Sequence, residues 1–320
     1  MFKKIIAGLA AGLIASAPAL AQDIKEINFG IISTEASQNL KSQWQPLLED
    51  MAKKTGYKVN AFFAPDYAGI IEGMRFGKVH IAWYGNKSAM EAVDRAGGEV
   101  FAQMVNADGT QGYYSQFVVH KDSPLKSLED VLKNSKSLSF GQGDPNSTSG
   151  FLVPGYYAFA QNKVDPKTAF KVVRSANHET NALAAANRQV DVAVTNSEAM
   201  TKIQDNLPEK FKELRVIWTS PLIPLDPLVM RKDLPEASKQ KIKDFFYSYG
   251  KGAEHEKEVL MKISKLSMFK PSTNAQLIPI RQLELFKDRN KFEGDAALLA
   301  VEKQAKVAEI DRKLAELARH

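Results

Sequence analysis

The feature that most constrains this chain is a repeated alternation of short apolar runs with stretches of helical spacing. Runs rich in β-branched residues predict strands at 27–32, 59–63, 79–83, 100–105, 114–120, 138–140, 170–174, 190–194 and 214–218. Helical spacing predicts helices at 44–54, 67–76, 88–95, 128–132, 150–161, 180–187 and 239–249. Such alternation predicts an α/β fold with mixed, mostly parallel sheets, in two successive units of roughly 100 residues.

Composition excludes several classes of protein. The chain has 320 residues, 44% of them hydrophobic and 25% charged, which is ordinary for a globular protein of about two domains. It contains no cysteine, so disulfides, thiolate catalysis and cysteine metal sites are excluded. The five histidines form no H-E-x-x-H motif, and no concentrated basic run suggests nucleic-acid binding, so we expect no metal, no cofactor and no nucleic acid.

The first residues have the pattern of a cleaved secretory signal. Lys3 and Lys4 precede an apolar stretch at 5–15, and Ala19-Leu20-Ala21 supplies a small-x-small cleavage site. Cleavage after Ala21 leaves 299 residues and lowers the formal net charge from +6 to +4. We therefore predict export to the periplasm. The alternative, a membrane anchor, has a stretch that is short for a span, and a lipid anchor needs a cysteine.

Three consecutive hydroxyl residues lie between a predicted strand and a predicted helix. Ser147, Thr148 and Ser149 stand where helix-start N–H groups are unpaired, with glycines on both sides that allow close backbone approach. This pattern favours a cradle for a small oxyanion, and the alternative is ordinary helix capping. No phosphate-loop or dinucleotide motif accompanies it.

A second set of polar and aromatic residues follows other predicted strands. In open α/β sheets ligands bind beyond the carboxyl ends of the strands, so we expect such residues to gather there. Taken singly, the tyrosines could serve packing, and the acids could be caps or solvated charges. The residues concerned are Asp66, Tyr67, Trp83, Tyr113, Tyr114, Glu198 and Asp226.

Four longer segments resemble the periplasmic phosphonate-binding proteins of phosphonate ABC transporters. They are FFAPDYAGII at 62–71, IAWYGN at 81–86, GDPNSTSGFLVPGYY at 143–157 and HETNALA at 178–184. The resemblance extends over nearly all of the mature chain up to about Lys287 and includes little of the C-terminal tail.

The resemblance implies a two-lobed type II periplasmic-binding fold, with two crossover strands as a hinge and the ligand in the cleft. It implies phosphonate contacts from Tyr67, Tyr113, Ser147, Thr148, Ser149 and His178. It also implies that Glu198 and Asp226 meet the amino end of an aminoalkylphosphonate. Two positions depart from the family pattern: Tyr114 stands where we expect tryptophan, and Leu225 precedes Asp226 where we expect glycine.

On this basis we divide the chain into a signal peptide, two lobes and a tail. The boundaries are 1–21 for the signal, 22–113 and 223–286 for the first lobe, 114–222 for the second lobe and 287–320 for a helical extension. Pro221, Pro224 and Pro227 predict a rigid connection where the chain returns to the first lobe.

The helical extension carries a small apolar seam at 3-4-3 spacing. The seam predicts either packing on the helix's own domain or self-association. Its residues are Val307, Ile310, Leu314 and Leu317.

The predicted function is a high-affinity receptor, not an enzyme, that binds 2-aminoethylphosphonate or another alkylphosphonate and delivers it to an ABC permease. One alternative keeps the receptor and changes the ligand to phosphate, phosphite or another small oxyanion. A second alternative is a secreted hydrolase that uses Ser147, His178 and Asp226, although no Gly-x-Ser-x-Gly elbow surrounds Ser147.

Overall fold

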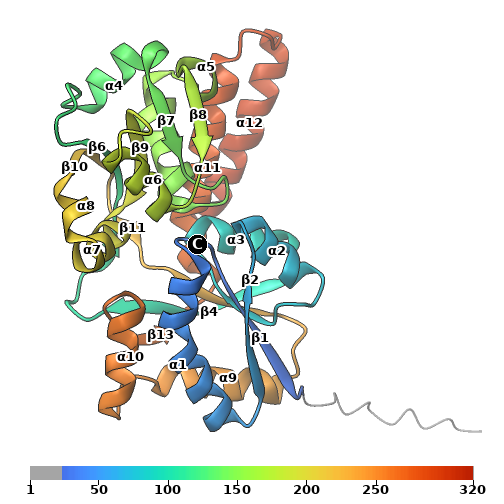
Figure 1. The fold of residues 1–320 in the computed structure, drawn as a ribbon. Helices are drawn as coiled ribbons and strands as arrows, with labels where there is room; N and C mark the ends of the chain where they lie inside the picture. Colours follow the sequence, from blue (N-terminus) through green and yellow to red (C-terminus); the bar gives the residue numbers. More distant parts are fainter. Residues whose placement is uncertain (1–23, 320) are drawn as a thin grey trace, which may run out of the picture.

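The computed structural model describes residues 24–319, which form two α/β lobes joined by crossover strands (Figure 1). Lobe 1 is built on a six-stranded sheet. In spatial order its strands are β13 (Leu266–Pro271), β4 (Gly98–Asn106), β12 (Pro227–Arg231), β3 (Ile81–Trp83), β1 (Glu26–Ile31) and β2 (Lys58–Phe63). Its helices are α1 (Ser37–Thr55), α2 (Tyr67–Arg75), α3 (Asn86–Arg95), α9 (Glu236–Ser248) and α10 (Glu254–Ser264).

Lobe 2 is built on a five-stranded sheet. In spatial order its strands are β10 (Leu214–Thr219), β6 (Ser115–His120), β9 (Val192–Asn196), β7 (Ser139–Gln142) and β8 (Val172–Ser175). Its helices are α4 (Leu128–Asn134), α5 (Pro166–Ala169), α6 (His178–Ala186), α7 (Ser197–Asn206) and α8 (Pro208–Lys212). The predicted α/β architecture is therefore confirmed, and most predicted strands lie within one or two residues of the observed ones.

The two lobes share one arrangement of strands and helices. In lobe 1, β1 pairs in parallel with β2 and β3, and in lobe 2, β7 pairs in parallel with β8 and β9. Each of these six strands leads into a helix at its carboxyl end. Six helix starts, with their unpaired N–H groups, therefore lie at the sheet edges that border the space between the lobes.

The link between the lobes contains a strand that the sequence analysis did not predict. The stretch 221–227 connects the lobes and contains β11 (Ile223–Pro224), which pairs antiparallel with β5 (Gly112–Tyr113), and it begins β12. β12 lies inside the six-stranded sheet between β3 and β4. This strand was missed because the prolines masked the apolar run that follows them. Pro227 is tolerated as the first residue of a strand, where its missing N–H costs little.

The helix predicted at 150–161 also differs from a regular helix. It begins at Thr148 and contains π-helical turns, η2 (Thr148–Leu152) and η3 (Gly155–Phe159). Pro154 has no N–H to bond to the carbonyl of Gly150, and that carbonyl instead accepts from the N–H of Gly143 at 3.0 Å. The helix start is thus fastened to the loop that precedes it.

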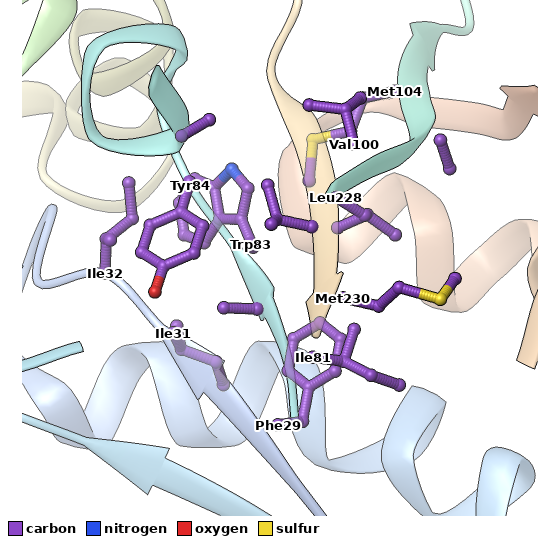
Figure 2. Packing of buried hydrophobic residues seen from close by; sticks show 14 of the residues in the cluster. Phe29, Ile31, Ile32, Ile81, Trp83, Tyr84, Val100, Met104, Leu228 and Met230 are labelled. Carbon is purple, nitrogen blue, oxygen red and sulfur yellow. The ribbon is translucent and has the colours of Figure 1, made fainter. Parts of the chain in front are cut away.

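Aromatic and aliphatic side chains hold β3 and β12 at the centre of the lobe 1 core (Figure 2). Trp83 at the end of β3 stacks on Trp44 of α1, with ring centroids 5.3 Å apart. Trp44 in turn packs 5.3 Å from Phe29 of β1. This stack fixes the orientation of the Trp83 indole at the edge of the cleft.

The C-terminal segment forms two packed helices, α11 (Ile278–Gly294) and α12 (Ala300–Leu317). α11 is bound to lobe 1 by the Arg281–Asp94 ion pair, and it contacts lobe 2 where Phe286 packs on Tyr156. On α12, Ile310 of the predicted seam is buried, and Val307, Leu314 and Leu317 are half-buried. Packing within the chain, the first of the two predicted alternatives, therefore buries one residue of the seam and half-buries the other three.

Two predictions concern membranes. Within residues 24–319, none of the helices combines the length and the apolar character needed to cross a bilayer. The predicted signal peptide, 1–21, lies outside the described residues.

We predict that Gly112→Ala destabilises the crossover pair. A Cβ at Gly112 would lie 2.1 Å from the carbonyl oxygen of Ile223, a backbone atom that cannot move aside without separating β5 from β11. We expect the free energy of unfolding in urea to fall by about 1–3 kcal/mol. Gly252→Ala is the matched control, because a Cβ there meets nothing within 4 Å. Equal stabilities of the two variants would contradict the prediction.

Candidate functional site

A cavity of about 500 Å³ lies between the lobes, and both lobes line it. From lobe 1 its walls come from α1, the start of α2 and the ends of β3 and β5, and from lobe 2 they come from the starts of η2, α6 and α7. Of the residues that position alone suggested, Trp83 lines this cavity, while Asp66 caps α2 and Tyr114 is exposed. All eight residues to which the resemblance gave a ligand contact line it. They are Tyr67, Tyr113, Ser147, Thr148, Ser149, His178, Glu198 and Asp226.

The loop before η2 is shaped so that the three hydroxyl residues enter the cavity. Ser147 is the N-cap, and its side-chain oxygen accepts from the N–H of Gly150 at 2.9 Å. Gly143 packs so closely against Gly150 that a Cβ at position 143 would lie 2.5 Å from the Gly150 Cα. The glycines on both sides of the hydroxyl residues are thus required by the close packing of the loop on the helix.

We call the three hydroxyl residues at 147–149 the hydroxyl step. Two of its hydroxyl groups, those of Thr148 and Ser149, are available as donors. Thr148 Oγ1 accepts from the N–H of Lys87 at 2.8 Å, and Ser149 Oγ accepts from Asn196 Nδ2 at 3.2 Å. Because each oxygen already accepts a bond from the protein, each hydroxyl keeps its own hydrogen to donate. Together with the unpaired helix-start amides, they form a buried surface of donors suited to an anion.

His178, the first residue of α6, lies against this step. Its Nε2 is 3.3 Å from Ser147 Oγ, and its buried Nδ1 has no hydrogen-bond partner in the part of the chain that the structure describes. Burial lowers the pKa of His178 to about 4, so the imidazole is neutral at physiological pH. A neutral ring with one open nitrogen can donate to a ligand oxygen through that nitrogen.

The geometry excludes the predicted hydrolase triad. Ser147 and His178 are neighbours, but the carboxylate of Asp226 hydrogen-bonds Trp83 and Tyr113 and does not orient His178. Without a group on Nδ1, the imidazole has nothing to set its tautomer or stabilise its charge. Within residues 24–319 no three His, Asp or Glu side chains are grouped to hold a metal ion either.

Asp226 forms the opposite end of the cavity. It accepts from Trp83 Nε1 at 3.0 Å and from the Tyr113 hydroxyl at 3.1 Å. The departure at Leu225 does not displace it, because the Leu225 carbonyl is held by the side-chain amides of Gln103 and Gln276 at 3.0 and 2.9 Å.

Glu198, in the first turn of α7, is the second acid at this end. Burial raises the pKa of Glu198, opposed by the charge of Lys202 and a hydrogen bond from Ser264. Burial, and then the charge of Glu198, raise the pKa of Asp226 well above its ordinary value. The ammonium of Lys202 is itself held by Glu35 and Gln43, at 2.5 and 2.8 Å. Within residues 24–319 neither acid forms an ion pair, and we expect a positively charged group of a ligand to bind there.

The two tyrosines are neutral donors. Burial, followed by the nearby acids, raises the pKa of Tyr67 and Tyr113 well above the ordinary value. Tyr67 begins α2, close to Ser147. Tyr113 lies at the acidic end, where its hydrogen is committed to Asp226 while that bond is formed.

Two further cavity residues with partners in the site were not among the candidates from the sequence. Asn196 ends β9 and fixes Ser149, and Lys202 lies one turn after Glu198. Trp83, a candidate by its position, ends β3 and fixes Asp226. Asn196 could have been found by the same signal, because it also ends an apolar strand at the ligand-binding edge of a parallel sheet.

Comparison with known proteins agrees with this geometry. The family model described as "ABC transporter, phosphonate, periplasmic substrate-binding protein" matches residues 29–277. This chain belongs to that family. It is a type II periplasmic-binding protein that serves as the phosphonate-binding receptor of an ABC transporter, and it is not an enzyme.

Individual relatives cover most or all of the chain. The phosphonates-binding periplasmic protein of Escherichia coli (strain K12) is 57% identical over 100% of this chain and 95% of its own length. The binding protein of a Pseudomonas aeruginosa ABC phosphonate transporter is 59% identical, with a TM-score of 0.91 over 93% of this chain and 98% of that one. PhnD1 of Prochlorococcus marinus (MIT 9301), solved with methylphosphonate, has the same fold at 22% identity, with a TM-score of 0.72 over 81% and 97% of the two chains.

We predict that Asp226→Asn stabilises the ligand-free protein. The substitution removes a buried charge next to Glu198, and the Tyr113 hydroxyl can turn to accept from the new amide, so no polar atom is left unpaired. We expect the free energy of unfolding at pH 7 to rise by about 1–3 kcal/mol.

The pH dependence checks this prediction. Because the pKa of Asp226 is raised in the folded state, its ionised carboxylate destabilises the fold at neutral pH. This destabilisation disappears as the pH falls through the pKa of the folded state toward the pKa of the unfolded state. The stability difference between variant and wild type should therefore shrink on acidification. A variant less stable than wild type at pH 7 would contradict it.

Proposed function

We propose that the receptor binds an aminoalkylphosphonate, with 2-aminoethylphosphonate as the leading candidate. The observation that carries this proposal is the pairing, in one buried cavity, of a donor-lined helix start with an acidic pair that lacks a cation. A ligand with a phosphonate at one end and an ammonium at the other is complementary to both.

The phosphonate oxygens would be held by Ser147, Thr148 and Ser149, with His178 and Tyr67 beside them. All of these groups are neutral, so the anion is bound by hydrogen bonds and by the positive end of the helix rather than by an ion pair. Hydrogen bonds to a charged group contribute about 1.5–3 kcal/mol each, so several are sufficient for tight binding.

The ammonium would lie between Glu198 and Asp226. It would offset the burial of both acids and the charge of Glu198 that adds to the raised pKa of Asp226, and Tyr113 would hold Asp226 in position. The alternative ligands, phosphate and phosphite, also fit the donor surface but leave the acids unpaired. Selectivity against them would come from that unpaired charge.

We infer that the chain is divided as the sequence suggests, with 22–113 and 223–286 in lobe 1 and 114–222 in lobe 2. The observed crossovers β5 and β11 lie at these boundaries. The last division, 287–320, falls inside α11, which runs from lobe 1 to lobe 2, so we propose that the helical extension braces the lobes rather than joining two copies of the protein.

We further propose that the precursor is cleaved after Ala21 and that the mature receptor delivers its ligand to the permease from the periplasm. The family is periplasmic, and the pattern of Lys3, Lys4 and Ala19-Leu20-Ala21 supports export. Mass spectrometry of the exported protein should find a mature chain beginning at Gln22.

Calorimetry with three ligands tests the ligand assignment. We expect 2-aminoethylphosphonate to bind more tightly than methylphosphonate, which lacks the ammonium, and both to bind more tightly than phosphate. Glu198→Gln should weaken binding of 2-aminoethylphosphonate by about tenfold or more while changing methylphosphonate binding little.

Glu209→Gln is the control, because that exposed acid on α8 pairs with Lys212 outside the cavity. No heat with any phosphonate at millimolar concentration would refute the proposed function. Equal losses for the two phosphonates in Glu198→Gln would refute the role of the acidic pair.

A further inference from the structure

Two residues in the segments that resemble the family's phosphonate site have no role in the proposed ligand contacts, yet they reach across the cleft. Asp144 precedes the hydroxyl step, and Glu179 follows His178 directly. Both carboxylates belong to lobe 2, and both accept hydrogen bonds from backbone N–H groups of lobe 1.

Glu179 completes the start of α1. The N-cap of that helix is Ala36, which has no side-chain oxygen, and the first turn contains no acid. Glu179 Oε2 accepts from the Ala36 N–H at 3.2 Å, and Oε1 lies 3.5 Å from the Asn39 amide. In an ordinary capping box a glutamate three residues into the helix makes this bond, and here the glutamate comes from the other lobe.

Thr148 completes the start of α3 in the same way. The N-cap there is Gly85, and the bond that a capping side chain would make to the second helical residue is made by Thr148 Oγ1 to the Lys87 N–H at 2.8 Å. A Cβ at Gly85 would lie 3.2 Å from that oxygen, so the glycine allows the close approach.

Asp144 adds a third bond of this kind. Its Oδ2 accepts from the N–H of Tyr67, the first residue of α2, at 3.1 Å, while Oδ1 accepts from Asn146 within its own loop at 2.7 Å. The starts of α1, α2 and α3 are thus all bonded by side chains of lobe 2. These bonds exist only when the lobes are together, because the donors and acceptors lie on different lobes.

We propose that these cross-lobe caps hold the closed state, and that Glu179 and Asp144 set the lifetime of the bound complex without touching the ligand. Two of the caps are carboxylates at the positive ends of helices, which is the favourable charge arrangement. Because Glu179 is adjacent to His178 and Asp144 to the hydroxyl step, ligand contact and capping occur on the same rigid segments. The proposal rests on the proposed function for the identity of the ligand, but not for the caps themselves.

The test compares Glu179→Gln with Glu129→Gln. Both acids are the second residue of a helix in lobe 2, and both substitutions remove one charge, but Glu129 is exposed in α4 and Glu179 bonds across the cleft. Stopped-flow measurement of the dissociation rate can use the fluorescence of Trp83, which lines the cavity.

We expect Glu179→Gln to accelerate dissociation by about tenfold for 2-aminoethylphosphonate and methylphosphonate alike, since a charge-assisted bond is lost and the ligand contacts are not. The ratio of the two affinities and the thermal stability of the ligand-free variant should stay at the wild-type values. A changed ratio would overturn the proposal, because it would mean that Glu179 contacts the ligand's amine. Dissociation at the rate of Glu129→Gln would also overturn it.

Small-angle X-ray scattering gives a readout that does not depend on phosphonate binding. The radius of gyration of Glu179→Gln should exceed that of wild type and of Glu129→Gln, because the lobes separate more readily. Equal radii for all three proteins would overturn the role of the caps even if the phosphonates bind. Failure of the phosphonates to bind wild type, with a larger radius for the variant, would overturn only the proposed function.

Discussion

Two hydrogen bonds to Asp226 tie together the segments on which the whole site depends. Trp83 donates from the end of β3 in lobe 1, and Tyr113 donates from β5 in the first crossover, while Asp226 itself follows β11 in the second. A buried carboxylate needs such donors, and these come from the points where the lobes are joined. Asp226 is therefore fixed where the lobes are joined, while Glu198, the other acid at this end of the cavity, comes from α7 of lobe 2.

The donor-lined end of the cavity, opposite the acids, results from the arrangement of the strands. Parallel strands in both lobes direct six helix starts toward the space between them, so positive partial charge faces the cleft from both sides. In the proposed function lobe 2 would use these starts to surround an anion with neutral donors, and it supplies side chains to the starts of lobe 1. The positive ends of the helices thus serve both ligand binding and lobe closure. This explains why residues proposed to contact the ligand and residues that cap helices of lobe 1 lie next to each other at 144–149 and 178–179.

Sequence reasoning identified the eight cavity residues by two routes. The hydroxyl step at 147–149 was visible from local chemistry, because strand, hydroxyls and helix follow one another directly. Tyr67, Tyr113, Glu198 and Asp226 were candidates by position, but their ligand contacts, and that of His178, came from the resemblance, since a single acid or histidine carries little signal of its own. The strand β12 was missed because Pro221, Pro224 and Pro227 masked an apolar run. The role of Glu179 was missed because its partners lie 140 and 143 residues away.

The sequence by itself determined the α/β class, the order of most strands and helices, and the place of the hydroxyl step, because periodicity and capping act between residues close in the chain. Only the tertiary structure decided that Asp226 bonds Trp83 and Tyr113 rather than His178, and that burial beside Glu198 raises its pKa. It also decided that the apolar seam of α12 is used within the chain. These outcomes depend on burial and on contacts between distant segments, which arise only when the lobes and the C-terminal helices have packed.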